Sequence, residues 1–162
     1  MPSKTSTDRL AERLIKMGLT LVVAESCTGG MLAEQCTSIS GGSAWFECGF
    51  VTYSNASKIR LLGVDANVID EHGAVSSQVA ELMALGALEH SDAEISAAIT
   101  GIAGPGGGSE SKPVGTVYIA TARKGQVASS KLHTFRGDRQ SIRNQSTQSA
   151  IEQLLERVSG KG

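Results

Sequence analysis

One stretch near the amino terminus constrains the fold more than any other part of the sequence. Residues 19–23 form an apolar, β-branched run of strand length, and residues 31–37 consist mainly of good helix formers. The turn between them reads Ala24-Glu-Ser-Cys-Thr-Gly-Gly30. A strand that passes through a sharp turn into a helix is typical of α/β proteins, where such turns lie at the carboxyl end of the sheet and ligands bind there.

The side chains of this turn leave two interpretations open. In the first, the turn belongs to a functional site in which Ser26 or Cys27 is a nucleophile, because a helix start lowers the pKa of a thiol. In the second, the turn is an ordinary helix start with Thr28 as the N-cap, glycines that ease the bend, and Cys27 as a small buried packing residue. The turn does not match the G-x-S-x-G motif of Ser-His-Asp hydrolases.

The rest of the chain alternates helices with strands and then ends in a hairpin and a helix. Apolar periodicity and capping residues predict a first helix capped by Thr7 or Asp8, short helices at 56–62 and 65–71, a helix after Ser76 and a last helix after Asp138. Further strands are expected at 45–53, 94–100, 114–122 and 127–135. This order predicts one domain over residues 1–162, an α/β protein built as a three-layer α/β/α sandwich on a mixed, mostly parallel sheet of about five strands with a late β-hairpin.

The composition of the chain argues against several classes of binding partner. The 162 residues carry 15 basic and 16 acidic side chains, and only 4% are aromatic, so nothing indicates a nucleic-acid partner. No apolar run is long enough to span a membrane. The three cysteines lack the spacing of a zinc site or a disulfide framework, which predicts no metal and a cytoplasmic location. We also expect a homo-oligomer.

A base for Ser26 is more plausibly a lysine than a histidine. Lys58 follows the second long strand and falls in the first turn of a short predicted helix, where the helix dipole disfavours the ammonium form. A neutral amine there could take the proton of a hydroxyl, and the phenol of Tyr53 could relay that proton or hold the amine. The alternatives are a surface lysine and a tyrosine that packs at a strand end.

Two further segments could bind a ligand. A glycine-rich loop follows the predicted strand at 94–100 and could present backbone N–H groups to an anion or a sugar, although it could equally be a flexible surface loop. It lacks the order of a Rossmann or P-loop fingerprint. Arg139 and Arg143 share one face of the last predicted helix and could grip a phosphate, or they could form a solvated face paired with Asp138.

Seven ordered motifs extend the argument over almost the whole chain. They are Ala24-Glu-Ser-Cys-Thr-Gly-Gly30, Gly41-Gly-Ser-Ala-Trp-Phe46, Gly49-Phe-Val-Thr-Tyr-Ser-Asn55 followed by Lys58, His72-Gly-Ala-Val-Ser76, Thr100-Gly-Ile-Ala-Gly-Pro105, Lys112-Pro-Val-Gly-Thr-Val117 and Phe135-Arg-Gly-Asp-Arg139. Together they resemble the CinA carboxy-terminal domain family. The resemblance implies an amidase that hydrolyses nicotinamide mononucleotide to nicotinate mononucleotide and ammonia in pyridine-nucleotide salvage, without a cofactor. Some members carry an additional amino-terminal domain, so only the amidase activity is expected here.

The resemblance also implies a Ser–Lys mechanism with an assisting tyrosine, which places the catalytic roles on Ser26, Lys58 and Tyr53. Oxyanion donors are expected among the backbone N–H groups of Cys27, Thr28, Gly29 and Gly30. Substrate contacts are expected from Thr100, Gly101, Gly104, Gly106, Gly107, Ser109, Arg139 and Arg143. The alternatives are a non-catalytic nucleotide-binding module and an interaction domain related to competence or DNA damage.

Overall fold

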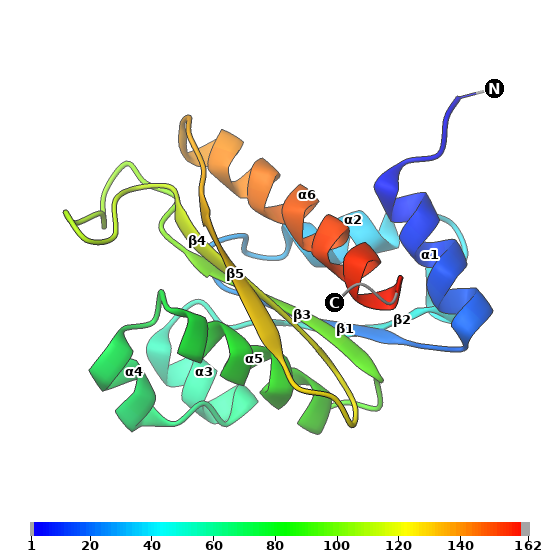
Figure 1. Cartoon of the computed structure of the whole chain (residues 1–162), viewed down its shortest axis with the longest axis horizontal. Coiled ribbons are helices and arrows are strands. Elements are labelled where there is room, and N and C mark those ends of the chain that lie inside the picture. The colour runs from blue at the N-terminus through cyan, green and yellow to red at the C-terminus, as the bar shows by residue number, and fades with distance from the viewer. Residues whose placement is uncertain (1, 160–162) are drawn as a thin grey trace.

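A five-stranded mixed sheet forms the centre of the molecule in the computed structural model, which describes residues 2–159 (Figure 1). The strands are β1 (Leu21–Glu25), β2 (Phe46–Val51), β3 (Ile95–Gly101), β4 (Thr116–Arg123) and β5 (Ser129–Thr134), in the spatial order β2-β1-β3-β4-β5. β1 pairs in parallel with β2 and β3, whereas the β3–β4 and β4–β5 pairs are antiparallel. Four strands therefore point the same way and only β4 is reversed, which confirms the mixed sheet and the late hairpin.

Helices cover both faces of this sheet (Figure 1). One face carries α1 (Ser6–Met17), α2 (Met31–Thr37) and α6 (Arg139–Val158), and the other carries α3 (Asn55–Leu62), α4 (Ala66–His72) and α5 (Ser77–Glu89). A short 3₁₀ helix, Gly42–Ala44, precedes β2. The α/β/α sandwich predicted from the sequence is thus confirmed. None of the helices described between residues 2 and 159 is long and apolar enough to cross a membrane.

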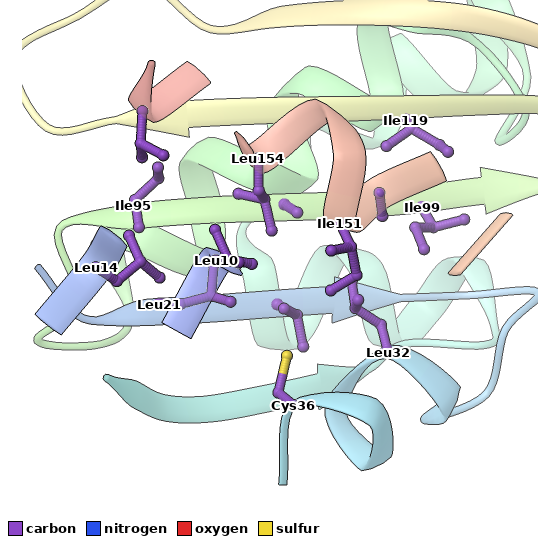
Figure 2. Packing of buried hydrophobic residues seen from close by; sticks show 14 of the residues in the cluster. Leu10, Leu14, Leu21, Leu32, Cys36, Ile95, Ile99, Ile119, Ile151 and Leu154 are labelled. Atoms are coloured by element: carbon purple, nitrogen blue, oxygen red, sulfur yellow. The ribbon is translucent and has the colours of Figure 1, made fainter. Parts of the chain in front are cut away.

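Alternating side chains of the central strands fill two separate cores. Leu21 and Val23 of β1 face the helices α1, α2 and α6, whereas Val22 and Ala24 face α3, α4 and α5. Figure 2 shows the first of these cores, in which side chains of all three helices meet strands β1, β3 and β4. Because both faces are covered, β1 is buried along its whole length, which explains the apolar sequence of residues 21–24.

Two capping predictions are wrong. α1 begins at Ser6 and its N-cap is Thr5, not Thr7 or Asp8. The Thr5 hydroxyl accepts from the Asp8 N–H while the Asp8 carboxylate accepts from the Thr5 N–H, so Asp8 is the far member of a capping box. Thr28 does not cap α2 either, since the N-cap position of that helix is Gly30.

The strand order places three chain segments side by side at one edge of the sheet. β1 lies between β2 and β3, and all three run in the same direction. Ser26 follows β1, residues 52–53 follow β2, and Thr100 and Gly101 end β3. The carboxyl edge therefore gathers the serine, the entry to α3 and the glycine-rich loop, as expected for a ligand site in an α/β sheet.

Candidate active site

Ser26 is fixed by the sheet itself. Its N–H donates to the carbonyl of Ile99 at 3.0 Å, which extends the ladder between β1 and β3 by one residue. The side chain is 8% exposed and lines a cavity of about 260 Å³ at the carboxyl edge. The other residues that line this cavity are Cys27, Tyr53, Asn55, Lys58, Ala74, Val75, Thr100, Gly101, Ile102, Ala103, Gly104, Gly106, Gly107 and Arg139.

Lys58 lines the same cavity, and its amine contacts the hydroxyl of Ser26. It lies in the first turn of α3, which begins after the N-cap Ser54. Its side chain is 1% exposed, and Nζ lies 3.0 Å from Ser26 Oγ. Nζ also donates to the carbonyl of Thr52 at 2.9 Å and to the carbonyl of Tyr53 at 3.3 Å. The predicted pairing of Ser26 with Lys58 is thus present in the structure.

Burial favours the neutral amine at this position. Loss of solvent lowers the pKa of Lys58 from its ordinary value, and the charge of an ionised Cys27 would be a weaker opposing influence. No carboxylate within residues 2–159 forms an ion pair with this lysine. When the amine is neutral, its two N–H groups can serve the two carbonyls, so its lone pair is left to accept the hydroxyl proton of Ser26.

Cys27 has the properties of a packing residue. Its side chain is 7% exposed and belongs to the core formed with α1, α2 and α6. Burial raises the pKa of the thiol to about 11, despite the nearby positive charge of Arg143. A thiol with that pKa is almost entirely protonated at neutral pH, so the geometry favours Ser26 over Cys27 as the nucleophile.

Glu25 organises the turn, although nothing in the sequence singled it out as more than part of the motif. Its carboxylate is fully buried and accepts from the Thr28 hydroxyl at 2.6 Å and from the N–H groups of Leu32 at 2.9 Å and Ala33 at 3.0 Å. Glu25 therefore satisfies the start of α2, the role that the sequence suggested for Thr28. The available signal was an acidic residue that ends an apolar strand directly before a helix start.

Tyr53 contacts the lysine through its backbone and not through its ring. The phenol oxygen lies 3.3 Å from Arg139 Nη2, and the side chain is 64% exposed. Arg139 also donates from Nη1 to the carbonyl of Gly104 at 2.8 Å. The amine of Lys58 is therefore held by the backbone carbonyl of Tyr53, whereas the phenol lies beside the guanidinium of Arg139. Both residues line the cavity.

The glycine-rich loop forms one wall of the cavity, as expected. Gly101, Gly104, Gly106 and Gly107 line it, but Ser109 does not, and its hydroxyl accepts from the Lys112 N–H instead. An added Cβ at Gly106 would meet no atom within 4 Å, so this position faces open space.

Thr100 also lines the cavity, although its hydroxyl donates to the carbonyl of Ala74 at 2.9 Å. That bond fixes Ala74 and Val75, two lining residues that sequence reasoning missed. Both lie in the motif His72-Gly-Ala-Val-Ser76, which was the available signal. The other missed residues, Asn55, Ile102 and Ala103, are neighbours of predicted ones.

Several other predicted site residues lie outside the cavity. Gly29 and Gly30 line a separate hollow of about 480 Å³ between α2 and α6. Arg143 contacts neither the cavity nor the glycine-rich loop, and its guanidinium donates to the carbonyls of Cys27 and Thr28 at 3.1 Å each. In the part of the chain that the structure describes, no group of three or more His, Cys, Asp or Glu side chains is placed to hold a metal ion.

Comparison with known proteins places this fold in a known family. The model of the CinA C-terminal domain matches residues 3–158, and the chain belongs to that family. The nicotinamide-nucleotide amidohydrolase PncC of Escherichia coli K12 is 46% identical over 148 residues, which cover 91% of this chain and 90% of the relative. The CinA-like protein of Citrifermentans bemidjiense is 49% identical over 147 residues. This chain spans about a third (35%) of the length of that relative and of a putative competence-damage inducible protein of Caldicellulosiruptor bescii.

Solved structures of related proteins have a similar fold. A CinA superfamily protein of Escherichia coli superposes with a TM-score of 0.90 at 39% identity, over 94% of this chain and 88% of that one. A competence/damage inducible protein of Agrobacterium tumefaciens superposes with a TM-score of 0.89 at 40% identity, over 98% of this chain and 99% of that one.

Proposed function

We propose that this chain is a nicotinamide-nucleotide amidohydrolase that converts nicotinamide mononucleotide and water to nicotinate mononucleotide and ammonia, in pyridine-nucleotide salvage. Its relatives in Escherichia coli and Pseudomonas putida carry the corresponding name and match it over most of both chains. The observation that carries the proposal is the 3.0 Å contact between Lys58 Nζ and Ser26 Oγ. A hydroxyl beside a buried amine that forms no ion pair within residues 2–159 is an arrangement suited to attack on an amide.

The proposed reaction proceeds in two steps. In the first, neutral Lys58 accepts the Ser26 proton while Oγ bonds to the amide carbon, and the carbonyl oxygen becomes an oxyanion. The C–N bond then breaks, and the ammonium of Lys58 returns the proton to the departing nitrogen, which leaves as ammonia. In the second, Lys58 takes a proton from water, the hydroxide attacks the ester, and Ser26 Oγ leaves with that proton. The nicotinate product is released and both side chains return to their starting state.

The remaining parts of the substrate supply binding energy that can orient the amide. The guanidinium of Arg139 and the backbone of Gly104–Gly107 lie on the same wall of the cavity and are the candidates for the phosphate. A site built for a phosphate loses affinity when its donors are left unpaired. Nicotinamide riboside and free nicotinamide should therefore be much poorer substrates than the mononucleotide, as ammonia release from each will reveal.

The decisive experiment measures ammonia release from nicotinamide mononucleotide by the purified protein and three variants. Ser26→Ala and Lys58→Met should abolish turnover, whereas Cys27→Ala should retain much of it. A wild-type protein without activity would refute the proposed function and would favour a module that only binds nucleotides. An active Ser26→Ala protein beside an inactive Cys27→Ala protein would move the nucleophile to the thiol. The cytoplasmic location and the homo-oligomer stay predictions.

A further inference from the structure

The carbonyl groups of Ser26, Cys27 and Thr28, in the turn after β1, each accept a hydrogen bond. The Ser26 carbonyl accepts from the Gly29 N–H at 3.1 Å. The Cys27 carbonyl accepts from Arg143 Nε, and the Thr28 carbonyl accepts from Arg143 Nη2, both at 3.1 Å. A Cβ built on Gly29 would lie 3.5 Å from Arg143 Nη2, so the guanidinium lies close to the turn. Arg143 thus holds two successive peptide groups with one planar fork.

The position of each carbonyl fixes the direction of the next N–H. These peptide bonds are trans, and in a planar trans peptide the C=O and the following N–H point in opposite directions. The Thr28 N–H is therefore turned away from Arg143, and the Cys27 N–H is turned away from the inside of the turn. No carbonyl of residues 2–159 accepts a hydrogen bond from either group. Within residues 2–159, the N–H groups of the two residues that follow Ser26 thus have no backbone acceptor.

The other donors of the turn are already used. The Gly29 N–H is bound to Ser26, and the first free N–H groups of α2 donate to the buried carboxylate of Glu25. Gly30 lines the separate hollow beside α6 rather than the cavity. Of the four residues expected to supply oxyanion donors, Cys27 is the one that lines the cavity, and Thr28 carries the adjacent N–H, for which no backbone acceptor lies within residues 2–159.

We propose that Arg143 is a positioning residue that aligns the N–H groups of Cys27 and Thr28 as donors to the tetrahedral oxyanion. The inference rests on the proposed amidase function and replaces the phosphate contact that the sequence suggested for Arg143. Its neighbour Arg139, one helical turn earlier, reaches the cavity and remains the candidate for the phosphate. The two arginines thus have separate roles, although they share one face of α6.

The test separates transition-state alignment from ground-state binding. Removal of one oxyanion donor lowers kcat by about 10²–10³, so loss of a residue that aligns such donors should lower kcat of Arg143→Ala by roughly tenfold to a hundredfold. The inhibition constant of the product nicotinate mononucleotide, which carries the phosphate but no tetrahedral centre, should change less than about twofold. Arg143→Lys keeps the charge but loses the fork, so its kcat should lie between those of the wild type and Arg143→Ala.

Gln140, on the same helix as Arg143, provides the control variant. Gln140→Ala removes only an exposed hydrogen bond to Asn144 on the same helix and should leave both constants unchanged. If Arg143→Ala keeps its kcat within about threefold, or if its product inhibition constant rises more than its kcat falls, the inference is wrong while the proposed function stands. If Arg143→Ala does not fold, the same comparison is made with Arg143→Lys. A wild-type protein without activity would instead refute the proposed function itself.

Discussion

The buried carboxylate of Glu25 allows a sharp test of how the turn is held. Oε1 accepts from the Thr28 hydroxyl and the Leu32 N–H, and Oε2 accepts from the Ala33 N–H. In Glu25→Gln the amide oxygen can keep the two bonds of Oε1, while the NH₂ group would face the Ala33 N–H as a second donor. The substitution therefore removes one hydrogen bond to a charged acceptor, together with the negative charge at the start of α2.

The magnitude follows from these two losses. A hydrogen bond to a charged group contributes about 1.5–3 kcal/mol, and a charge at a helix terminus contributes about 0.3–1 kcal/mol. Glu25→Gln should thus lower the free energy of unfolding by about 2–4 kcal/mol. Glu25→Ala would leave three buried donors without an acceptor and could cost as much as the whole stability of a domain, roughly 5–15 kcal/mol. The glutamine variant is the measurable one.

Urea unfolding followed by circular dichroism measures this effect. With a slope of about 1–3 kcal/mol per M, the midpoint should fall by roughly 0.7–4 M at an unchanged slope. The matched control is Glu34→Gln in the first turn of α2, because within residues 2–159 its carboxylate accepts no hydrogen bond, and that variant should lose only the contribution of a charge at a helix terminus, about 0.3–1 kcal/mol. Equal midpoints for the two variants would refute the assignment of Glu25 as the acceptor that holds the turn.

Two further predictions concern the cavity. Lys58 is a base only when neutral, and burial lowers its pKa from the ordinary 10.5, so kcat/KM should rise with pH along a limb whose apparent pKa lies below 10.5. Lys58→Arg should be almost inactive at every pH because a guanidinium stays protonated, and native-like turnover of that variant would contradict the mechanism. Gly106→Val should raise KM for nicotinamide mononucleotide about tenfold or more without loss of stability, because a side chain there enters open space at the cavity wall. Gly42→Ala, at a glycine outside the cavity with room for a Cβ, is the control, and equal KM values for the two variants would show that the loop does not approach the substrate.

The sequence predicted the layers of the fold because each layer leaves a local signature. β1 and β3 consist mainly of apolar residues since helices cover both faces of the sheet, and the last two strands follow each other through a short turn. Capping was harder to predict, because any nearby oxygen can satisfy the start of a helix. At α2 that oxygen belongs to Glu25, in the preceding strand, while the N-cap position holds Gly30, which has no side chain to accept a hydrogen bond.

The pairing of Ser26 with Lys58 was predictable because both follow the carboxyl ends of adjacent parallel strands. The partners of the arginines were not, since two residues four apart on one helix face look alike in sequence. Arg139 donates to a carbonyl of the glycine-rich loop, whereas Arg143 donates to carbonyls of the turn after β1. Only the packing of α6 determines which carbonyls lie within hydrogen-bonding distance of each arginine.

Two backbone hydrogen bonds continue the sheet beyond its strands and connect the proposed catalytic residues to the folded core. The Ser26 N–H extends the ladder to β3, and the Thr52 N–H, which belongs to the residue whose carbonyl holds the lysine, extends the ladder to Glu25. The proposed nucleophile and the residue whose carbonyl holds the proposed base are therefore both hydrogen-bonded to the inner strands β1 and β3, and inner strands are among the last parts of a domain to open by local fluctuation. Heat or denaturant should then abolish turnover only under conditions that unfold the domain itself. The residual activity of a sample should therefore be proportional to its fraction of folded molecules.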